Sequence, residues 1–221
     1  MSFSHLTDLA LSSGGVLFVM PILLLVTLTV SFERVWYLAR LMSTSRATIA
    51  RVADLTNLDQ GELERELVHV DGQPIGSVLR VPLAFPDERD HARLADRLEE
   101  AILREVPRVD RSLWLLDTAV TLAPLLGLLG TIIGMFNAFQ VLGQPGTAPT
   151  EITGGVAEAL IATASGLFIA IIGLVFFNSL QARVRLVVHD LETLKMILVN
   201  RLSGDAEAEV QVTRSVSVRG I

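Results

Sequence analysis

The sequence predicts an all-α integral membrane protein with three transmembrane helices and long cytoplasmic helical extensions. Two observations carry this prediction. The chain of 221 residues is 51% hydrophobic with a mean hydropathy of +0.53, and its apolar residues are gathered into three long uncharged blocks. In addition, its basic residues are distributed unevenly between the segments that those blocks separate.

Each block is long enough to cross a bilayer. Residues 14–32, 118–139 and 159–182 carry no charge, and about 20 apolar residues span the hydrocarbon layer as a helix. The first block has no basic segment before it, and Glu33 and Arg34 follow it in place of a small-residue cleavage site, so we expect an anchor and not a signal peptide. The expected organisation is an N-terminus at 1–13, spans at 14–36, 113–141 and 153–178, a loop at 142–152, a helical domain at 37–112, a helix at 179–202 and a disordered tail at 203–221.

The basic residues predict the orientation. Residues 1–33 and 142–152 contain no Lys or Arg, so all 18 basic residues lie on one side of a three-span topology. Because cytoplasmic segments carry an excess of Lys and Arg, that side is expected in the cytoplasm, with the N-terminus and the loop at 142–152 in the periplasm.

Three patterns organise the cytoplasmic segments. The sequence from Asp59 to Glu62 is typical of a helix start, and Leu94, Leu98 and Ile102 fall on one face of a second charged helix. Between them, glycines and prolines at 72–86 predict short pieces. A coiled-coil-like seam extends the third span, through Leu180, Val184, Val187, Leu191, Leu194 and Leu198.

Composition excludes several functional classes. The chain has no Cys, and its four His lie outside the apolar blocks without metal-ligand spacing, so neither a metal site nor a cofactor is expected. A net charge of −6 without a dense basic patch argues against nucleic-acid binding. An intramembrane protease is also excluded, because Ser165 has no His at membrane depth. We therefore expect a protein that is not an enzyme.

Small residues line one face of the second and third spans. Around Thr131, a face of small residues opposes a bulky aliphatic face, and a second small stripe, flanked by Thr163, follows the third span. The candidate packing residues are Gly127, Gly134, Gly155, Gly166 and Ala170. Such faces often serve helix packing alone, and a membrane Thr often bonds its own backbone. The alternative is that Thr131 and Thr163, expected at similar depth, line a narrow polar path.

Glu158 is the one ionisable group well inside the third span. A lone carboxylate in the membrane costs at least about 2.5 kcal/mol, which favours a functional or paired group. The alternative is an interfacial Glu that reaches water. Since Glu158 and Thr163 are about 140° apart around the helix, both cannot point at one axis.

Two motifs carry a family resemblance. LAPLLGLLGTIIGM at 122–135 and GVAEALIATASGL at 155–167 closely resemble the second and third spans of the ExbB and TolQ proteins and, more distantly, MotA. The resemblance implies a homopentamer whose second and third spans line a pore that holds two single-span ExbD- or TolR-like helices. It also implies proton-pathway roles for Thr131, Thr163 and Glu158. The family usually has Ala-Ile-Pro where this chain has Ala170, Ile171, Ile172 and Gly173.

The function expected from this resemblance is that of an inner-membrane proton-channel subunit. An aspartate on the ExbD-like partner would carry the proton, since no Asp lies at mid-depth in these spans, and a TonB-like protein would receive the work. The alternatives are a TolQ-like subunit of a Tol-Pal-type system and a passive membrane scaffold, which would tolerate Ala at Thr131, Thr163 and Glu158.

Overall fold

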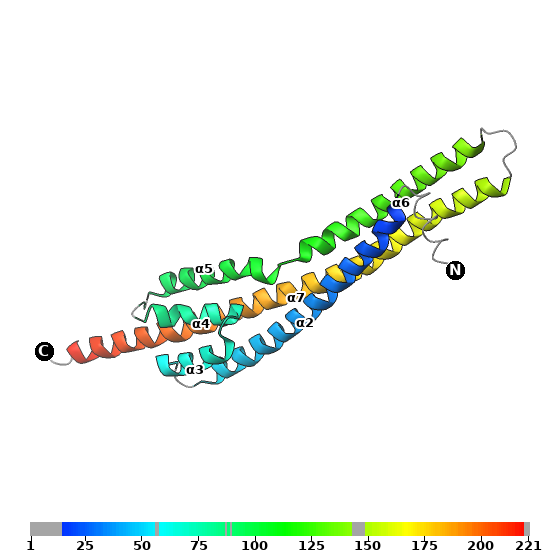
Figure 1. Cartoon of the computed structure of the whole chain (residues 1–221). Helices are drawn as coiled ribbons and strands as arrows, with labels where there is room; N and C mark the ends of the chain where they lie inside the picture. Colours follow the sequence, from blue (N-terminus) through cyan, green and yellow to red (C-terminus); the bar gives the residue numbers. More distant parts are fainter. Residues whose placement is uncertain (1–14, 56–57, 87, 89, 143–148, 219–221) are drawn as a thin grey trace. The chain divides into compact units, whose positions relative to one another are not determined.

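The computed structural model describes residues 15–55, 58–86, 88, 90–142 and 149–218, with side chains described at 15–55, 58–86, 88, 90–140 and 153–202. The described residues form six helices and no strand (Figure 1), which confirms the predicted all-α class. They are α2 (Val16–Asp54), α3 (Gln60–Val70), α4 (Pro74–Ala84), α5 (His91–Val109), α6 (Leu113–Leu142) and α7 (Pro149–Val218). The helices α2, α6 and α7 are long and apolar enough to span a membrane.

The chain divides into two units, each with its own packing. The first unit contains 1–35 and 112–180, and the second contains 36–111 and 181–221. The expected N-terminal segment 1–13 and most of the expected loop at 142–152 lie outside the described residues.

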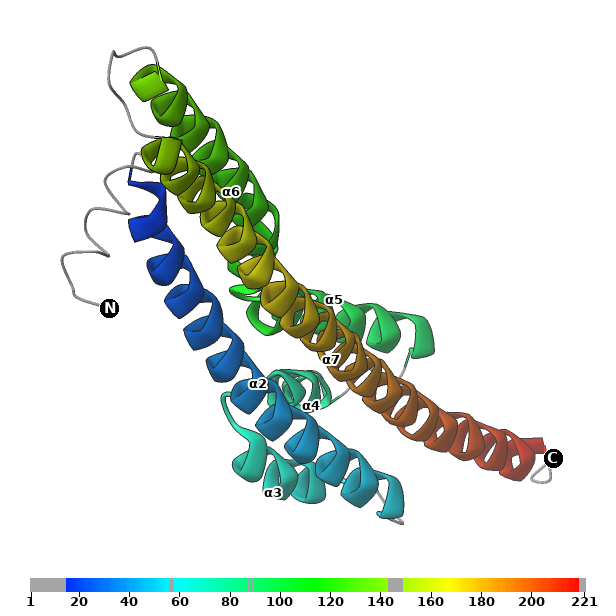
Figure 2. The same ribbon diagram turned by 90° about the vertical axis from the view of Figure 1, so that its right-hand side faces the viewer.

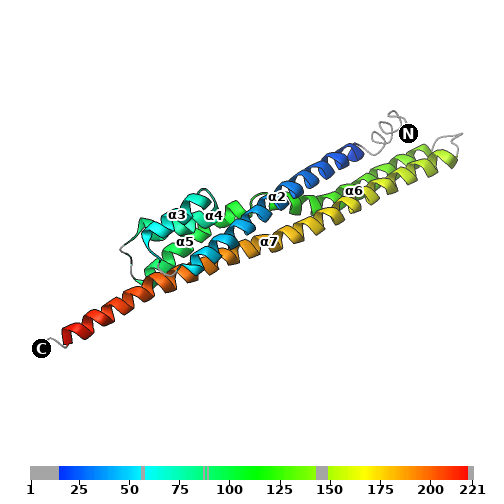
Figure 3. The ribbon, with the colours of Figure 1, turned by 90° about the horizontal axis from the view of Figure 1, so that it is seen from below.

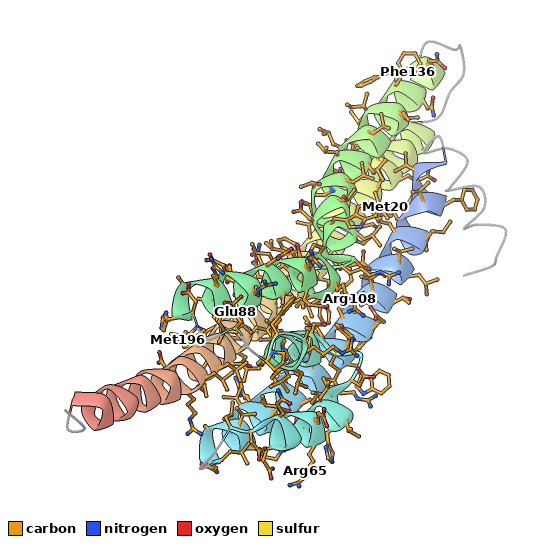
Figure 4. The ribbon with its side chains drawn as sticks, turned by 90° about the vertical axis from the view of Figure 1, so that its left-hand side faces the viewer. Met20, Arg65, Glu88, Arg108, Phe136 and Met196 are labelled. Carbon is orange, nitrogen blue, oxygen red and sulfur yellow. The ribbon has the colours of Figure 1, made fainter. Side chains whose placement is uncertain are left out.

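The first unit is built from the start of α2, from α6 and from the first part of α7. Figure 2 shows α6 running alongside α7. A small core holds α2 to this pair through Val16, Met20, Ala123 and Ile169. Bulky side chains such as Phe136 lie on the outer side of α6 (Figure 4), where 62% of the Phe136 surface is exposed. An apolar exterior over small-residue contacts is the pattern of helices that pack within a membrane.

Local sequence signals account for the short helices of the second unit. Asp59 caps α3 by accepting a hydrogen bond from the Glu62 amide at 2.8 Å, which confirms the helix start expected there. Asp90 caps α5 in the same way through the amide of Ala92 at 3.0 Å. The predicted face of α5 is buried, with Leu98 fully inside the core of this unit.

The coiled-coil-like seam is also buried in the structure. Its six residues, from Leu180 to Leu198, are each at most 8% exposed, and α7 continues through them as one uninterrupted helix, as the sequence predicts. In α2, a matching series of residues is buried at alternating spacings of three and four: Leu38, Leu41, Ser45, Thr48 and Val52.

Three element boundaries differ from the expected ones. The helix of the first span does not end near 36 but continues to Asp54, because 37–54 contains neither Gly nor Pro. At 74–84 the expected short pieces form one helix, in which Pro74 occupies the first turn and Gly76 lies against the carbonyl of Val70. Where the sequence predicted a disordered tail at 203–221, α7 extends to Val218, and this stretch contains no proline that would end the helix.

Candidate functional site: two threonines beside a close-packed helix pair

The two long helices α6 and α7 approach each other through small residues. We define the contact stripe of each helix by the residues that meet there, namely Ala123, Gly127, Gly130, Gly134 and Ala138 in α6, and Gly155, Ala159, Ala162 and Gly166 in α7. A Cβ atom added at Gly130 would lie 2.7 Å from the Ala162 Cβ, and one added at Gly134 would lie 2.9 Å from the Ala159 Cβ. No larger side chain fits at either position.

Backbone meets backbone further along the same stripe. A Cβ added at Gly127 would lie 3.0 Å from the carbonyl oxygen of Ala162, and one at Gly166 would collide with the carbonyl oxygen of Ala123. Gly155 adjoins Ala138 in the same way, with 3.1 Å between an added Cβ and the Ala138 Cβ. Residue numbers rise along α6 as they fall along α7, so the two helices are antiparallel.

Thr163 joins the two helices directly. Its hydroxyl donates a hydrogen bond to the carbonyl oxygen of Gly127 at 3.0 Å, across the helix contact. The absence of a side chain at Gly127 is what gives the hydroxyl access to this carbonyl. Thr163 is therefore part of the α6–α7 contact as well as a candidate pathway residue.

Thr131 bonds within its own helix. Its hydroxyl donates to the carbonyl oxygen of Leu128 at 2.7 Å, which is the local bonding that the sequence analysis left open as an alternative. This bond uses the only hydroxyl proton, whereas the oxygen keeps lone pairs that can accept from a partner.

The two threonines lie one helical turn apart. Thr163 is level with Gly127, four residues before Thr131, and four residues span about 6 Å of helix. The sequence analysis expected them at similar depth, so their offset along the helices is a correction. The register of α6 against α7 determines this offset.

Both threonines nevertheless lie on the same side of the helix pair. At 100° per residue, each threonine lies about 60° around its helix from the centre of the contact stripe. Because the two helices are antiparallel, both threonines then point to the same side of the pair. The helix α2 packs on the other side, where Met20 belongs to a cluster with Leu126, Ile133 and Ile169 (Figure 4). The threonine side of the pair is thus the side that α2 leaves uncovered.

Glu158 lies away from the two threonines. It precedes Ala159 of the contact stripe and is rotated about 80° toward the α2 side of α7. The side chain is partly buried. The structure therefore does not bring the three candidate pathway residues into one cluster, in keeping with the 140° separation expected from the sequence. Ala170, the fifth candidate packing residue, packs against the small core that holds α2.

The sequence analysis did not single out a polar contact at the end of the first span. The Arg34 side chain is buried, and its guanidinium lies 2.9 Å from a Glu33 carboxylate oxygen and donates to the Ser112 hydroxyl at 3.4 Å. Ser112 directly precedes α6 and has a φ of +69°, a conformation that L-residues other than glycine rarely adopt. The placement of Arg34 directly after an uncharged block was the signal that could have indicated this contact.

Three long apolar helices, two of them packed through small residues, define a multi-pass membrane protein. The sequence matches the MotA/TolQ/ExbB proton channel family over residues 70–193, more than half of the chain. The chain belongs to this family, as the resemblance predicted, and its members are transport components of membranes and not enzymes.

Similar proteins carry the names ExbB and TolQ. The biopolymer transport protein ExbB-like 1 of Synechocystis sp. is 34% identical over 181 residues, which cover 80% of this chain and 70% of that protein. The biopolymer transport protein ExbB of Xanthomonas campestris pv. campestris is 42% identical over 82 residues, 37% of this chain and 32% of its own length. The Tol-Pal system protein TolQ of Pseudomonas aeruginosa is 41% identical over 92 residues, 41% of this chain and 39% of its own length.

Proposed function

We propose that this chain is the proton-channel and stator subunit of an ExbB–ExbD-type motor in the bacterial inner membrane. Such a motor uses the proton motive force to energise a TonB-like protein for outer-membrane transport. The observation that carries the proposal is the position of Thr131 and Thr163 on the side of the α6–α7 pair that α2 leaves uncovered. Family membership and the similarity to ExbB proteins support it.

In this proposal five copies of the chain surround a central pore, with the threonine side of each α6–α7 pair turned inward. An ExbD- or TolR-like single-span partner occupies the pore and brings the carboxylate that carries the proton. The N-terminus is periplasmic and the C-terminus cytoplasmic, in line with the distribution of Lys and Arg. Moving one charge through 100 mV supplies about 2.3 kcal/mol, which is enough to drive successive steps of the inner helices.

The two threonines have different roles in this mechanism. The Thr131 oxygen accepts a hydrogen bond from the protonated partner, because its own proton is already donated to Leu128. Thr163 fixes the register of the helix pair through Gly127 and places the Thr131 oxygen one turn away. Glu158, rotated toward the α2 side, tunes proton entry and subunit packing and is not the main carrier.

Substitutions at the threonines test the proposal. Thr131→Val and Thr163→Val preserve shape but remove the hydroxyl, so we expect loss of transport driven by the proton motive force while the oligomer still assembles. Thr163→Ser keeps the hydroxyl and should retain transport. Thr118→Val is the matched control, because Thr118 is exposed and donates to the Trp114 carbonyl of its own helix at 2.8 Å. Wild-type transport in both Val variants would contradict the proposal and support the alternative that the chain is a passive scaffold.

Glu158 is tested in the same transport assay. Glu158→Gln keeps shape and hydrogen bonding and should retain more activity than Glu158→Ala. Complete loss in both variants, with normal assembly, would instead make Glu158 an obligatory proton carrier.

A TolQ-like role in a Tol-Pal-type system is the second candidate. The similarity to TolQ of Pseudomonas aeruginosa favours it, and that match is of nearly the same strength as the match to ExbB of Xanthomonas campestris. Complementation of strains lacking either system distinguishes the two. Restored TonB-dependent uptake supports the ExbB-like role, and restored envelope integrity supports the TolQ-like role.

A further inference from the structure

A cleft between α4 and α5 is not used by the proposed proton pathway. These two helices of the second unit lie side by side (Figure 3) and enclose about 520 Å³. Three arginines line this cleft, Arg80 from α4, and Arg97 and Arg104 from α5, together with the aromatic ring of Phe85 and the carboxylates of Glu100 and Glu105. A cleft with basic groups on both walls is suited to an anionic ligand.

The carboxylate at the base of the cleft is already satisfied. Glu105 is buried at 7% exposure, accepts a hydrogen bond from the Ser77 hydroxyl at 2.7 Å and lies 3.0 Å from the Arg108 guanidinium. Figure 4 labels Arg108 and Glu88 on this part of the molecule. Because Arg108 compensates its charge, Glu105 repels an incoming anion less than a free carboxylate would.

Each of the three arginines has a carboxylate partner, and the partners of Arg80 and Arg104 are exposed. Arg80 pairs with Asp71, Arg97 lies 3.5 Å from a Glu88 oxygen, and Arg104 lies 2.5 Å from a Glu100 oxygen. The arginine side chains are 57%, 40% and 76% exposed, respectively. The pairs of Arg80 and Arg104 are exposed on both sides and therefore weak in water, so exchanging one carboxylate for another costs little there, whereas the Glu88 side chain that pairs with Arg97 is only 15% exposed.

Arg97 is the best-oriented of these cations. Its guanidinium lies 3.7 Å from the centre of the Phe85 ring, and this stacking fixes the plane of its donors. Arg104 is seven residues further along α5, which places it two turns away on the same face, at a distance of about 10 Å. Two acceptor groups spaced along a ligand can therefore meet the two arginines separately.

We propose that this cleft binds an acidic peptide segment of a partner protein, with carboxylates spaced to meet Arg97 and Arg104. An extended segment of a few residues covers the distance of about 10 Å between these arginines. The cleft is lined by several charged side chains, unlike the mostly apolar pockets of small molecules. Recognition of acidic motifs by arginine clusters is a recurring mode of peptide binding. This proposal does not depend on the proton pathway.

Binding of a fluorescein-labelled peptide that alternates glutamate and leucine tests the proposal. Fluorescence anisotropy is measured on the whole detergent-purified protein, with a lysine–leucine peptide as the ligand control. Arg97→Gln and Arg104→Gln should each weaken binding about tenfold, the effect of one lost charge-assisted hydrogen bond. Arg65→Gln is the matched control, because it removes the same charge from an exposed pair with Glu62 on α3 and should leave binding unchanged.

Glu88→Gln gives the sharpest result. It removes one negative charge and frees Arg97 from its present partner, so it should strengthen binding of the acidic peptide. Equal affinity in the wild type and in both arginine variants, or no binding to the wild type, would overturn the proposal. So would displacement of the peptide by inorganic phosphate at concentrations similar to those of the peptide, since that result would indicate a single-anion site. Circular dichroism of each variant confirms that the helices are intact.

Discussion

Moving one methyl group across the α6–α7 contact tests whether steric fit holds these helices together. A Cβ added at Gly130 would lie 2.7 Å from the Ala162 Cβ, whereas its next neighbours, in the Val16 side chain, are at 3.4 and 3.6 Å. The collision thus involves one methyl group. Replacing Gly130 with Ala should force the helices apart, and replacing Ala162 with Gly in the same chain should let them return.

The expected energies follow from two opposing effects. Overpacking costs about 1–3 kcal/mol, while Ala in place of Gly within a helix contributes about 1 kcal/mol. Gly130→Ala alone should therefore destabilise the protein by up to about 2 kcal/mol. In the double variant the helix propensities cancel and the collision disappears, so stability should return close to wild type. The coupling between the two sites should be about 1–3 kcal/mol.

The measurement is thermal or denaturant-induced unfolding of the purified protein in one detergent. Gly154→Ala serves as the matched control, because an added Cβ there meets no atom within 4 Å and the substitution should not destabilise. If the effects of Gly130→Ala and Ala162→Gly simply add, the contact stripe is not a steric fit and the register inferred from it is wrong.

Two further predictions concern the second unit. Arg201 donates to the carbonyl oxygens of Val52, Ala53 and Leu55 at the end of α2, so Arg201→Gln should lower the free energy of unfolding by about 1–2 kcal/mol, more than Arg201→Lys, which keeps the charge. Burial raises the pKa of the Asp190 carboxyl above its ordinary 3.8, an effect that charges nearby only partly offset. Its charged form is thus disfavoured in the folded state, and the contribution of Asp190 to stability should fall as pH rises above 3.8. Asp190→Asn should therefore raise the melting temperature at about pH 7, by an amount that shrinks toward about pH 4, and an unchanged difference between these pH values would refute the assignment.

The sequence was sufficient to predict features that depend on neighbouring residues within one helix. The Asp59 cap, the buried face of α5 and the coiled-coil-like seam all follow from the spacing of a few neighbouring residues. The cleft between α4 and α5 depends instead on two helices, one of which contains Gly76 and Pro82 and reads as a broken segment. It forms because tertiary packing overrides those breakers, and the sequence alone offers no measure of that packing.

The register of α6 against α7 shows the same limit at the candidate site. The contact stripe of α7 has a small residue at each turn, so sliding the helix by one turn still places small residues against small residues. Steric fit alone therefore permits several registers, which is why the sequence analysis expected the two threonines at similar depth. The Thr163 hydroxyl removes this degeneracy, because in the observed register it donates to the Gly127 carbonyl, which no side chain covers. Thr163→Val should consequently lower the preference for this register by about 0.6–1.7 kcal/mol, a typical range for interhelical hydrogen bonds in membranes. Cysteine pairs placed along α6 and α7 would report the change as crosslinks one turn out of position.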